Sequence, residues 1–419
     1  MRARTEPEAT QDRASDPVAR LRIGRGPWLL DEGRPHWARP RSSFRTDIVI
    51  VGAGITGSLA AECLTRLGYR VALVDRLAPG QGSTAASTAM LQWEIDESLV
   101  DLSDAYGFEK AAFAYRLSLS AVSGLGDLAA TLGIACDWRW RDALMLAAEG
   151  DDGRSIEEEA TARKRAGLPS AFLRPEALRD RYGIRRTAAA VSRGAATCDP
   201  VRLAHGLLAA AVERGAVLIH DEVAAYDSDR RCARVRLAGG FEIEARMLVL
   251  ATGYEMPPFV SAPPHRMSAS WAAATAAGAD LSFWRGETLI WEDATPYLYA
   301  RTTADRRLLV GGEDEAVSDP VERDGLAPAK AAAMHDKLEA LWGLKLPPFE
   351  RVWSAAFGET ADGLPLIGPV PGAPNVFAAY GYGGNGITFS YLAARMIAAM
   401  IGGKAQPWFD SFALDRPPP

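Results

Sequence analysis

The spacing of apolar residues near the start of the chain changes its period twice within a short segment. Residues 47–51 consist of Asp47 followed by four apolar residues, which is typical of a buried strand. Residues 58–67 then place apolar side chains three and four positions apart, as one face of an amphipathic helix requires. Gly68 ends this pattern, and Val71–Asp75 is a second short apolar run with an acid at its end. The segment therefore predicts a strand, a helix and a second strand.

The rest of the chain alternates between helical and extended patterns. Long apolar periodicity covers residues 108–132, and a charged exposed pattern covers residues 155–165. Asp199 followed by Pro200 predicts the start of a helix, with Asp199 as its N-cap. Helices are also predicted at 328–344 and after 387, and short strands at 216–220, 232–237, 241–244, 247–250 and between 265 and 312. Such a mixture indicates an α/β protein.

Composition narrows the class of protein. A chain of 419 residues with 48% hydrophobic residues is long enough for two globular domains. The net charge of −6 and the lack of a basic stripe argue against nucleic-acid binding, and no run of eighteen apolar residues predicts a membrane span. Charged residues near the N-terminus without an apolar stretch exclude a secretory signal. Four scattered cysteines without CxxC spacing predict free thiols, a cytoplasmic location and no metal site.

The first strand–helix turn carries the dinucleotide-binding pattern in its full context. Gly52 permits a tight turn, Gly54 lets a pyrophosphate approach the backbone, and Gly57 lets the helix pack closely on the strand. The helix N-terminus offers free N–H groups to phosphate oxygens. Asp75 at the end of the second strand is placed to accept hydrogen bonds from a ribose. The alternative is a glycine-rich turn without a ligand.

A second glycine-rich turn occurs near the other end of the chain. Residues 381–386 read Gly-Tyr-Gly-Gly-Asn-Gly, and a helix begins near Ile387. This arrangement would aim a second helix N-terminus at an electron-rich group, such as the N1–C2=O edge of a reduced flavin. A nicotinamide dehydrogenase needs only the first turn, so the pair favours a tightly held flavin. The alternative is a turn made only for packing.

These blocks resemble the D-amino-acid oxidase / glycine oxidase superfamily of FAD-dependent oxidoreductases. The resemblance rests on residues 48–75, 80–89, 248–253 and 353–388, in family order, and spans roughly 45–405. It implies an α/β fold in which a Rossmann-like FAD-binding domain is interleaved with a substrate domain containing a mixed or antiparallel sheet. We expect the FAD-binding domain at 46–97, 191–255 and 352–410, the substrate domain at 98–190 and 256–351, a leader or surface strap at 1–45 and a tail at 411–419.

The resemblance also implies which residues contact the cofactor. The first turn would hold the pyrophosphate, Asp75 the adenosine ribose, the Ser/Thr-rich loop the phosphates and the approach to the ring, and the second turn the isoalloxazine edge. The expected cofactor-binding residues are Gly52, Gly54, Ile55, Thr56, Gly57, Asp75, Arg76, Ser83, Thr84, Ser87, Gly253, Gly383, Gly384, Asn385, Gly386, Ile387 and Thr388.

Three positions depart from the pattern of the family. Its amino-acid oxidases carry an Arg that binds the substrate carboxylate, and Phe357 falls at that position. A simple α-amino acid would therefore lose its bidentate anchor. Ala355 stands where sarcosine-oxidase-like members attach flavin through a Cys, so we expect noncovalent FAD. Leu309 falls near the Lys that some members use to activate O2, so the electron acceptor is either O2 or another oxidant.

Two groups of residues are candidates for substrate contacts. Glu94 or Asp96 could hold an ammonium group, and Trp93 could add a cation–π contact. The alternative is a solvated loop or a helix cap. Tyr299 and Arg301 share one face of a predicted strand, and Arg301 could replace the missing carboxylate clamp; the alternative is a cross-strand surface pair. Further candidates are Trp271, Glu359, Tyr380 and Tyr382.

The resulting interpretation is an FAD-dependent oxidase or dehydrogenase that oxidises the C–N bond of a small amine or amino acid. A neutral amine can transfer hydride to flavin N5 once the two are held at near-attack distance, so little acid–base machinery is needed. The expected catalytic residues are Arg301, Tyr299, Trp93 and Glu94. The alternative is a flavin-binding sensor or a non-catalytic subunit of a larger oxidoreductase. The pattern does not predict an oligomeric state.

Overall fold

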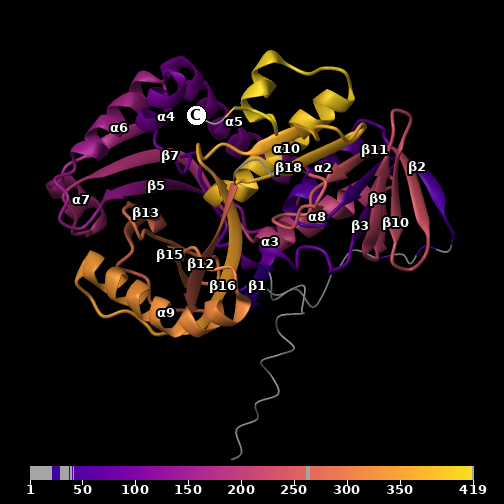
Figure 1. The fold of residues 1–419 in the computed structure, drawn as a ribbon. Helices are drawn as coiled ribbons and strands as arrows, with labels where there is room; N and C mark the ends of the chain where they lie inside the picture. Colours follow the sequence, from indigo (N-terminus) through magenta and orange to yellow (C-terminus); the bar gives the residue numbers. More distant parts are fainter. Residues whose placement is uncertain (1–20, 29–36, 38–39, 41, 261–264, 418–419) are drawn as a thin grey trace, which may run out of the picture.

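The structure is a computed structural model that describes residues 21–28, 37, 40, 42–260 and 265–417. The described strands form two sheets, and each sheet collects strands from segments that lie far apart in the chain. Figure 1 shows the two sheets in separate halves of the molecule, with several helices between them and others at the periphery. This arrangement is the expected α/β fold with a mixed second sheet.

The smaller sheet is built around the first predicted strand. Ile48 and Ile50 of this strand pack in one core, whereas Val49 and Val51 pack in another core on the opposite face, as the alternation of a strand requires. In order across the sheet, the main strands are β17 (Leu366–Pro369), β18 (Val376–Tyr380), β11 (Glu242–Leu250), β2 (Phe44–Val51), β3 (Val71–Asp75) and β8 (Val217–His220).

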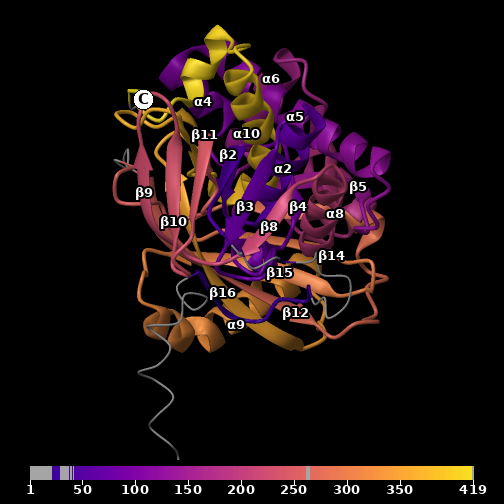
Figure 2. The same ribbon diagram turned by 90° about the vertical axis from the view of Figure 1, so that its right-hand side faces the viewer.

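Most neighbours in this sheet are parallel. β2 pairs in parallel with β3 and β11, and β3 pairs in parallel with β8. Figure 2 shows these strands side by side, together with the antiparallel strands β9 (Val223–Ser228) and β10 (Ala233–Leu237) that extend β11. The helices α2 (Ile55–Arg66), α8 (Pro200–Glu213) and α10 (Gly386–Ile401) pack together on one face. The parallel strands bring the carboxyl ends of the strands and the helix N-termini to one edge of the sheet.

The larger sheet has ten strands among the described residues and is mostly antiparallel. Its order is β1 (Arg22–Gly24), β16 (Phe349–Thr360), β12 (His265–Thr275), β15 (Leu308–Glu315), β14 (Leu298–Thr302), β13 (Leu289–Asp293), β5 (Arg139–Ala147), β7 (Ala189–Thr197) and β4 (Met90–Leu91), with β6 (Ser170–Leu173) paired to β7. Only β13 and β5 pair in parallel within this sheet. Figure 1 shows α9 (Pro320–Trp342) beneath β12, β15 and β16.

The remaining helices lie between and around the sheets. α5 packs against α10, so the segment after the Ser/Thr-rich loop contributes to the core of the nucleotide-binding half. The other elements are α3 (Ser83–Ala86), α4 (Leu99–Tyr106), α5 (Phe108–Thr131), α6 (Arg154–Arg165), α7 (Pro175–Tyr182) and the short 3-10 helices η1 (Arg285–Glu287), η2 (Gly383–Asn385) and η3 (Pro407–Phe412).

The sheets divide the chain differently from the expected domain boundaries. Residues 191–197 of β7 and 352–360 of β16 pair within the larger sheet, although they were expected in the FAD-binding domain. Their partners are distant in sequence, so local patterns do not reveal them. The described end of the leader forms β1 and pairs with β16, as a strap would, and most of residues 1–45 lie outside the described residues.

Two local expectations need correction. The helix expected at 328–344 begins at Pro320, because Asp319 caps it by accepting hydrogen bonds from Val321 N and Glu322 N, and the helix continues through Pro328. The expected tail is also packed: Phe412 and Leu414 are buried, and Arg416 Nη2 donates to Asp362 Oδ1 at 2.7 Å. The ion pair anchors the end of the described chain beside β17.

Among the described residues, no helix combines the length and the apolar character needed to cross a bilayer.

The capping predicted for α8 is confirmed, because Asp199 Oδ1 accepts hydrogen bonds from both Val201 N and Arg202 N at 2.9 Å. The four cysteines are all free thiols.

Candidate active site

The first glycine turn is shaped by contacts that exclude any side chain. Gly52 has φ of +109°, and a Cβ placed there would lie 2.1 Å from the carbonyl oxygen of Ala251. A Cβ on Gly57 would lie 1.8 Å from the carbonyl oxygen of Gly52. Both obstacles are backbone atoms, which cannot move aside. The two glycines therefore allow α2 to start close against the end of β2.

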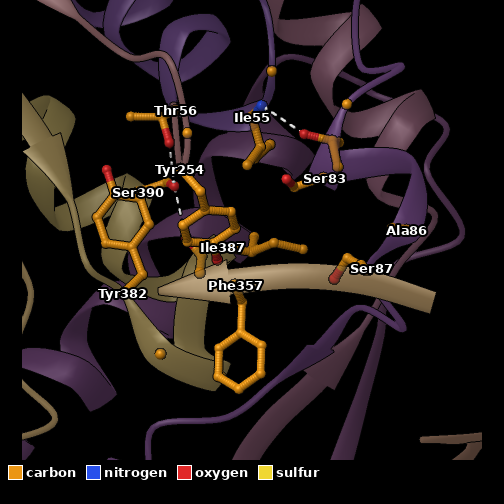
Figure 3. Close-up of a pocket in the computed structure, with 18 of the residues that line it drawn as sticks. Ile55, Thr56, Ser83, Ala86, Ser87, Tyr254, Phe357, Tyr382, Ile387 and Ser390 are labelled. Atoms are coloured by element: carbon orange, nitrogen blue, oxygen red, sulfur yellow. Dashed lines mark hydrogen bonds between the residues drawn. The ribbon is translucent and has the colours of Figure 1, made fainter. Parts of the chain in front are cut away.

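The N-terminus of α2 faces a cavity without a side-chain cap. Gly54 is the N-cap residue and makes no side-chain cap, and the first turn carries no acid. Ile55 N donates to Thr84 Oγ1 at 3.0 Å, which ties α2 to α3. Thr56 Oγ1 lies 2.8 Å from Ser390 Oγ of α10, as Figure 3 shows. The helix end thus keeps backbone donors for a ligand, and its position is fixed relative to the second glycine turn.

The N-terminus of α10 faces the same cavity and also has no side-chain cap of its own. The loop before it is held by Asp96, which follows β4. Gly384 N donates to Asp96 Oδ2 at 2.7 Å, and Asn385 Nδ2 donates to Asp96 Oδ1 at 3.2 Å and to the Glu94 carbonyl at 2.8 Å. A Cβ on Gly383 would lie 2.0 Å from Asp96 Oδ2, so the close approach requires glycine.

Both turns open into one cavity of about 600 Å³, a size ordinary for a small-molecule or cofactor site. At one end Asp75 lines it, with Oδ2 accepting from Ala53 N at 2.6 Å and Oδ1 from Leu77 N at 2.8 Å. Burial raises the pKa of Asp75, and these two backbone hydrogen bonds oppose the shift. Arg76 forms ion pairs with Glu222 and Glu255 at the same end.

The structure brings most of the expected cofactor residues to the wall of this cavity. Gly57 and Thr388 lie outside it: Gly57 serves the close packing described above, and Thr388 Oγ1 donates to the Gln92 carbonyl. The residues that line it are Gly52, Gly54, Ile55, Thr56, Asp75, Arg76, Ser83, Thr84, Ser87, Gly253, Gly383, Gly384, Asn385, Gly386 and Ile387.

The opposite end of the cavity is lined by aromatic side chains from four separate segments. Figure 3 shows the rings of Tyr254 and Tyr382 next to each other, and the ring of Phe357 on the other side of β16. Tyr297 and Tyr299 complete this end, with ring centroids 5.9 Å apart. Burial raises the pKa of Tyr299 to about 12, so its hydroxyl stays neutral at physiological pH. We call this part of the cavity the aromatic end.

Trp93 and Glu94 have different positions. Trp93 is fully buried outside the cavity, its ring packs edge-on against Tyr115, and its indole N–H donates to the Arg193 carbonyl. The structure thus places Trp93 in the core, not where a substrate could meet it. Glu94 lines the cavity with a buried carboxylate, and Arg163 Nη1 lies 3.6 Å from its Oε1. Burial raises the pKa of Glu94, and the Arg163 charge opposes that rise.

Arg301 does not occupy the position of a carboxylate clamp. Its side chain is 2% exposed, lies outside the cavity, donates to the Cys198 carbonyl at 3.0 Å and stacks on the Trp28 ring. Tyr299 does line the cavity, but two residues along a strand span about 7 Å, which carries Arg301 beyond the cavity wall. Tyr299 and Arg301 therefore share a strand face, but this face runs from the cavity into the core, and the expected clamp position of Arg301 was wrong. Burial lowers the pKa of Arg301 to about 10.

Two of the three positions that depart from the family pattern lie at the cavity wall. Phe357 and Ala355 both line the cavity from β16, and no cysteine lines it within the described part of the chain. Leu309 is fully buried and lies outside the cavity. The further candidates divide in the same way: Glu359 and Tyr382 line the cavity, whereas Trp271 donates its indole N–H to the Arg323 carbonyl in the core.

Sequence reasoning missed Tyr254 and did not single out Asp96 as a fixed part of the loop. Asp96 is exposed to the cavity while protein surrounds it on its other sides. Burial, together with the nearby carboxylates of Glu359, Asp314 and Glu97, raises the pKa of Asp96 to about 7. Tyr254 directly follows Gly253, which was expected to lie near the adenine side of the cofactor. This position in the sequence could have indicated that Tyr254 lines the cavity.

Two helix N-termini without side-chain caps, glycine contacts that admit no side chain and one continuous cavity fit an extended dinucleotide with a flavin ring. The chain belongs to the DAO family of FAD dependent oxidoreductases, which matches residues 47–400 and confirms the resemblance. It therefore binds FAD and is an oxidoreductase of a family that acts on amines or amino acids.

Individual relatives are distant. The chain is 25% identical over 384 residues to gamma-glutamylputrescine oxidoreductase of Escherichia coli (strain K12), with 88% of this chain and 87% of that protein covered. It is 21% identical over 393 residues to a protein of Bacillus subtilis (strain 168) named as a Rieske 2Fe-2S iron–sulfur protein, with 93% and 75% covered. Its fold is similar to glycine oxidase from Geobacillus kaustophilus, with a TM-score of 0.75, 21% identity, and 90% and 100% covered.

Proposed function

We propose that this protein oxidises the C–N bond of a small amine by hydride transfer to bound FAD. The observation that carries the proposal is the single cavity that runs from the uncapped N-terminus of α2, past the loop at Gly383–Ile387, to the aromatic end between the two sheets. A cofactor held at the two glycine turns leaves the aromatic end for a substrate. When bound, FAD supplies an acceptor for one hydride, which is two electrons and one proton.

The chain itself contributes position and a dry environment. Tyr254, Tyr382 and Phe357 enclose the aromatic end with apolar ring surface, which excludes water from the reacting carbon. Tyr297 Oη donates to Asp314 Oδ2 at 2.6 Å, so its ring is held in one orientation. Near-attack positioning of this kind lowers the barrier without a dedicated acid or base. Of the expected catalytic residues, Tyr299 and Glu94 line this cavity, and Tyr299 is the one at the aromatic end that we propose lies beside the substrate.

The N-terminus of α10 has a separate role. Its backbone N–H groups and positive dipole end face the cavity next to the aromatic end, where they can stabilise negative charge that develops during hydride transfer. Asp96 holds the loop at Gly384 in the position that this role requires.

The overall reaction balances as follows. The amine loses a hydride from carbon and a proton from nitrogen and becomes an imine, and water then hydrolyses the imine to a carbonyl compound and a released amine or ammonia. The two electrons pass to O2, which gives hydrogen peroxide with two protons, or to another acceptor. The absence of cysteine from the described cavity wall supports noncovalent FAD, and the free thiols support a cytoplasmic location.

An anaerobic titration of the purified yellow protein with amines and amino acids tests the proposal. The expected result is a loss of FAD absorbance at ~450 nm on addition of an amine. One carbonyl molecule should form for each flavin that is reduced. A flavoprotein whose absorbance no amine or amino acid changes would contradict the proposal and would favour a sensor or a non-catalytic subunit.

A further inference from the structure

The cavity is strongly biased towards negative charge. Among its lining residues ten carry carboxylates, and Arg76 is the one lining residue that carries a permanent positive charge in the described part of the chain. Arg76 lies at the nucleotide end, where it pairs with Glu222 and Glu255. The aromatic end therefore has carboxylates along its wall and no lining cation. A substrate carboxylate at that end would meet repulsion instead of a clamp.

Some of these carboxylates are neutralised by cations behind the wall. Glu292 pairs with Arg186 at 2.6 Å, and both side chains are buried. Glu359 Oε1 accepts hydrogen bonds from Arg266 Nη2 at 2.8 Å and from Ser268 Oγ at 2.9 Å, although Arg266 itself is largely exposed. These pairs hold their carboxylates in place and reduce their charge.

Asp96 is different, because its hydrogen-bond partners are uncharged. It accepts hydrogen bonds from the Gly384 N–H and the Asn385 amide, and it forms no ion pair with a described Lys, Arg or His. The groups that face it are the carboxylates of Glu359 on β16, Asp314 on β15 and Glu97 on its own loop, together with the hydroxyls of Tyr254 and Tyr297. Like charges therefore lie near Asp96, and Asp96 itself has no counter-ion among the described residues.

Glu94 adds a further carboxylate to the same wall. Glu94 is 3% exposed and lines the cavity, yet neither of its carboxylate oxygens has a hydrogen-bond partner among the described residues. Its contact with Arg163, at 3.6 Å, is longer than a hydrogen bond. Arg163 and the Ser192 hydroxyl both act to lower the pKa of this buried carboxyl group, so the protein itself stabilises the carboxylate, which adds negative charge to the cavity wall.

The walls of the aromatic end suit the same charge. Tyr297, Tyr299, Tyr254 and Phe357 present ring surface to the cavity beside Asp96 and Glu359. Aromatic faces attract ammonium groups, and more strongly when water is excluded. Carboxylates combined with aromatic rings form a pocket for an alkylammonium ion.

We propose that the substrate is a diamine-type cation: an aliphatic amine with a second, protonated nitrogen and no carboxylate, its ammonium held by Asp96 and Glu359 among the aromatic rings. This inference rests on the proposed function. The nitrogen that undergoes oxidation needs its lone pair and is neutral when it reacts, so the charge that the carboxylates hold belongs to the other nitrogen. Phe357, in place of an arginine, then removes the group that would favour amino acids.

A series of three four-carbon amines tests the charge preference in the FAD-bound protein. 1,4-Diaminobutane, 1-aminobutane and 4-aminobutanoate have similar length and end in a cation, a neutral methyl group and an anion. The diamine should give the largest kcat/KM, at least ~10-fold above 1-aminobutane, and 4-aminobutanoate the smallest. Butyltrimethylammonium, which has no lone pair to be oxidised, should bind to the holoenzyme by calorimetry, whereas hexanoate should not.

Substitutions connect the preference to named residues. Glu359→Gln and Asp96→Asn should each weaken butyltrimethylammonium binding ~10-fold and reduce the advantage of the diamine. Glu350→Gln is the matched control, because Glu350 lies on the same strand, is exposed and lies outside the cavity. Retained FAD absorbance shows that a variant is folded. Asp96→Asn could lose FAD, because Asp96 also holds the loop at Gly384. Glu359→Gln does not change that contact, so it still tests the cation pocket if Asp96→Asn does not bind FAD.

The outcomes separate this inference from the proposed function. If 4-aminobutanoate or glycine reduces the flavin more efficiently than the diamine, the cation pocket is wrong and amine oxidation stands. If no amine reduces the flavin but butyltrimethylammonium binds and the two substitutions weaken it, amine oxidation is wrong and the cation pocket stands. Equal binding of the cation to wild type and both variants overturns the cation pocket.

Discussion

The two ends of the cavity recognise their ligands by different means. The nucleotide end is built from backbone: Gly52 and Gly57 bring α2 against β2, and the N-terminus of α2 has no side-chain cap. The aromatic end is built from side chains that come from the loops after β4 and β11, from β14 and the residue before it, from β16 and from the loop before α10. Backbone recognition needs a fixed local conformation, whereas side-chain recognition can change with a single substitution.

This difference explains why the cofactor follows from the family and the substrate does not. A glycine turn keeps its function only if no side chain intrudes, so the motif varies little in form. Phe357, by contrast, lies on the regular strand β16 where the resemblance places an arginine, and under the proposed cation pocket this one replacement changes which substrates fit.

The largest effect is expected from Gly57→Ala at the nucleotide end. The new Cβ would lie 1.8 Å from the Gly52 carbonyl oxygen, and only a shift of α2 from β2 relieves that overlap. We expect the purified protein to lack FAD absorbance and to lose about 1–3 kcal/mol in its free energy of unfolding. Gly325→Ala is the control, because a Cβ there meets nothing within 4 Å and the site lies in helix α9. A yellow Gly57→Ala protein would contradict the backbone account.

Phe357→Arg should reverse the charge preference of the aromatic end. The guanidinium would pair with carboxylates such as Glu359 and offer a bidentate contact to a substrate carboxylate. We expect the ratio of kcat/KM for 1,4-diaminobutane over 4-aminobutanoate to fall by ~100-fold, with FAD content unchanged. Phe357→Leu removes the ring without adding charge, and it should reduce both rates while keeping their order. An unchanged ratio in Phe357→Arg would place substrate recognition elsewhere.

The raised pKa of Asp96, about 7, predicts a pH dependence at the aromatic end alone. The carboxyl group is neutral below this pH and anionic above it, so binding of a cation strengthens as pH rises. For butyltrimethylammonium, whose own charge is constant, affinity for the holoenzyme should increase ~10-fold from pH 6 to pH 8. Calorimetry at several pH values measures this, and Asp96→Asn should give a flat profile. A wild-type affinity that falls with pH would be the opposite of this expectation.

The smallest effect is expected from Arg301→Met, which tests the corrected position of Arg301. The side chain contacts the Cys198 carbonyl and the Trp28 ring in the core and does not reach the cavity. Arg301 forms no ion pair with an acid among the described residues, so methionine removes a buried charge without leaving a buried counter-charge behind. We therefore expect kcat/KM for amines and amino acids to stay within about twofold, with a modest change in Tm. A loss of ~100-fold confined to amino acids would restore the clamp hypothesis.

Patterns along the chain predicted the elements whose causes are local. The glycines of the first turn, the Asp199 cap of α8 and the start of α10 all depend on residues within a few positions, and each was predicted. The start of α9 was missed because Pro328 was taken as a boundary, although Asp319 and Pro320 supply a better one. The packed end of the chain was missed because its partner, Asp362, lies far upstream.

The sequence by itself determined the family, the cofactor and the nucleotide end of the cavity, because backbone recognition is encoded in short, contiguous motifs. It also identified Phe357 and Ala355 as departures, because these positions are counted from a motif. Tertiary structure alone decided that Trp93 and Arg301 belong to the core and that Asp96, Glu359 and Tyr254 face one cavity. The physical reason is that the burial of a side chain and the charges around it depend on its neighbours in space. Strand pairing across a sheet brings these neighbours together, and their spacing in the sequence does not reveal them.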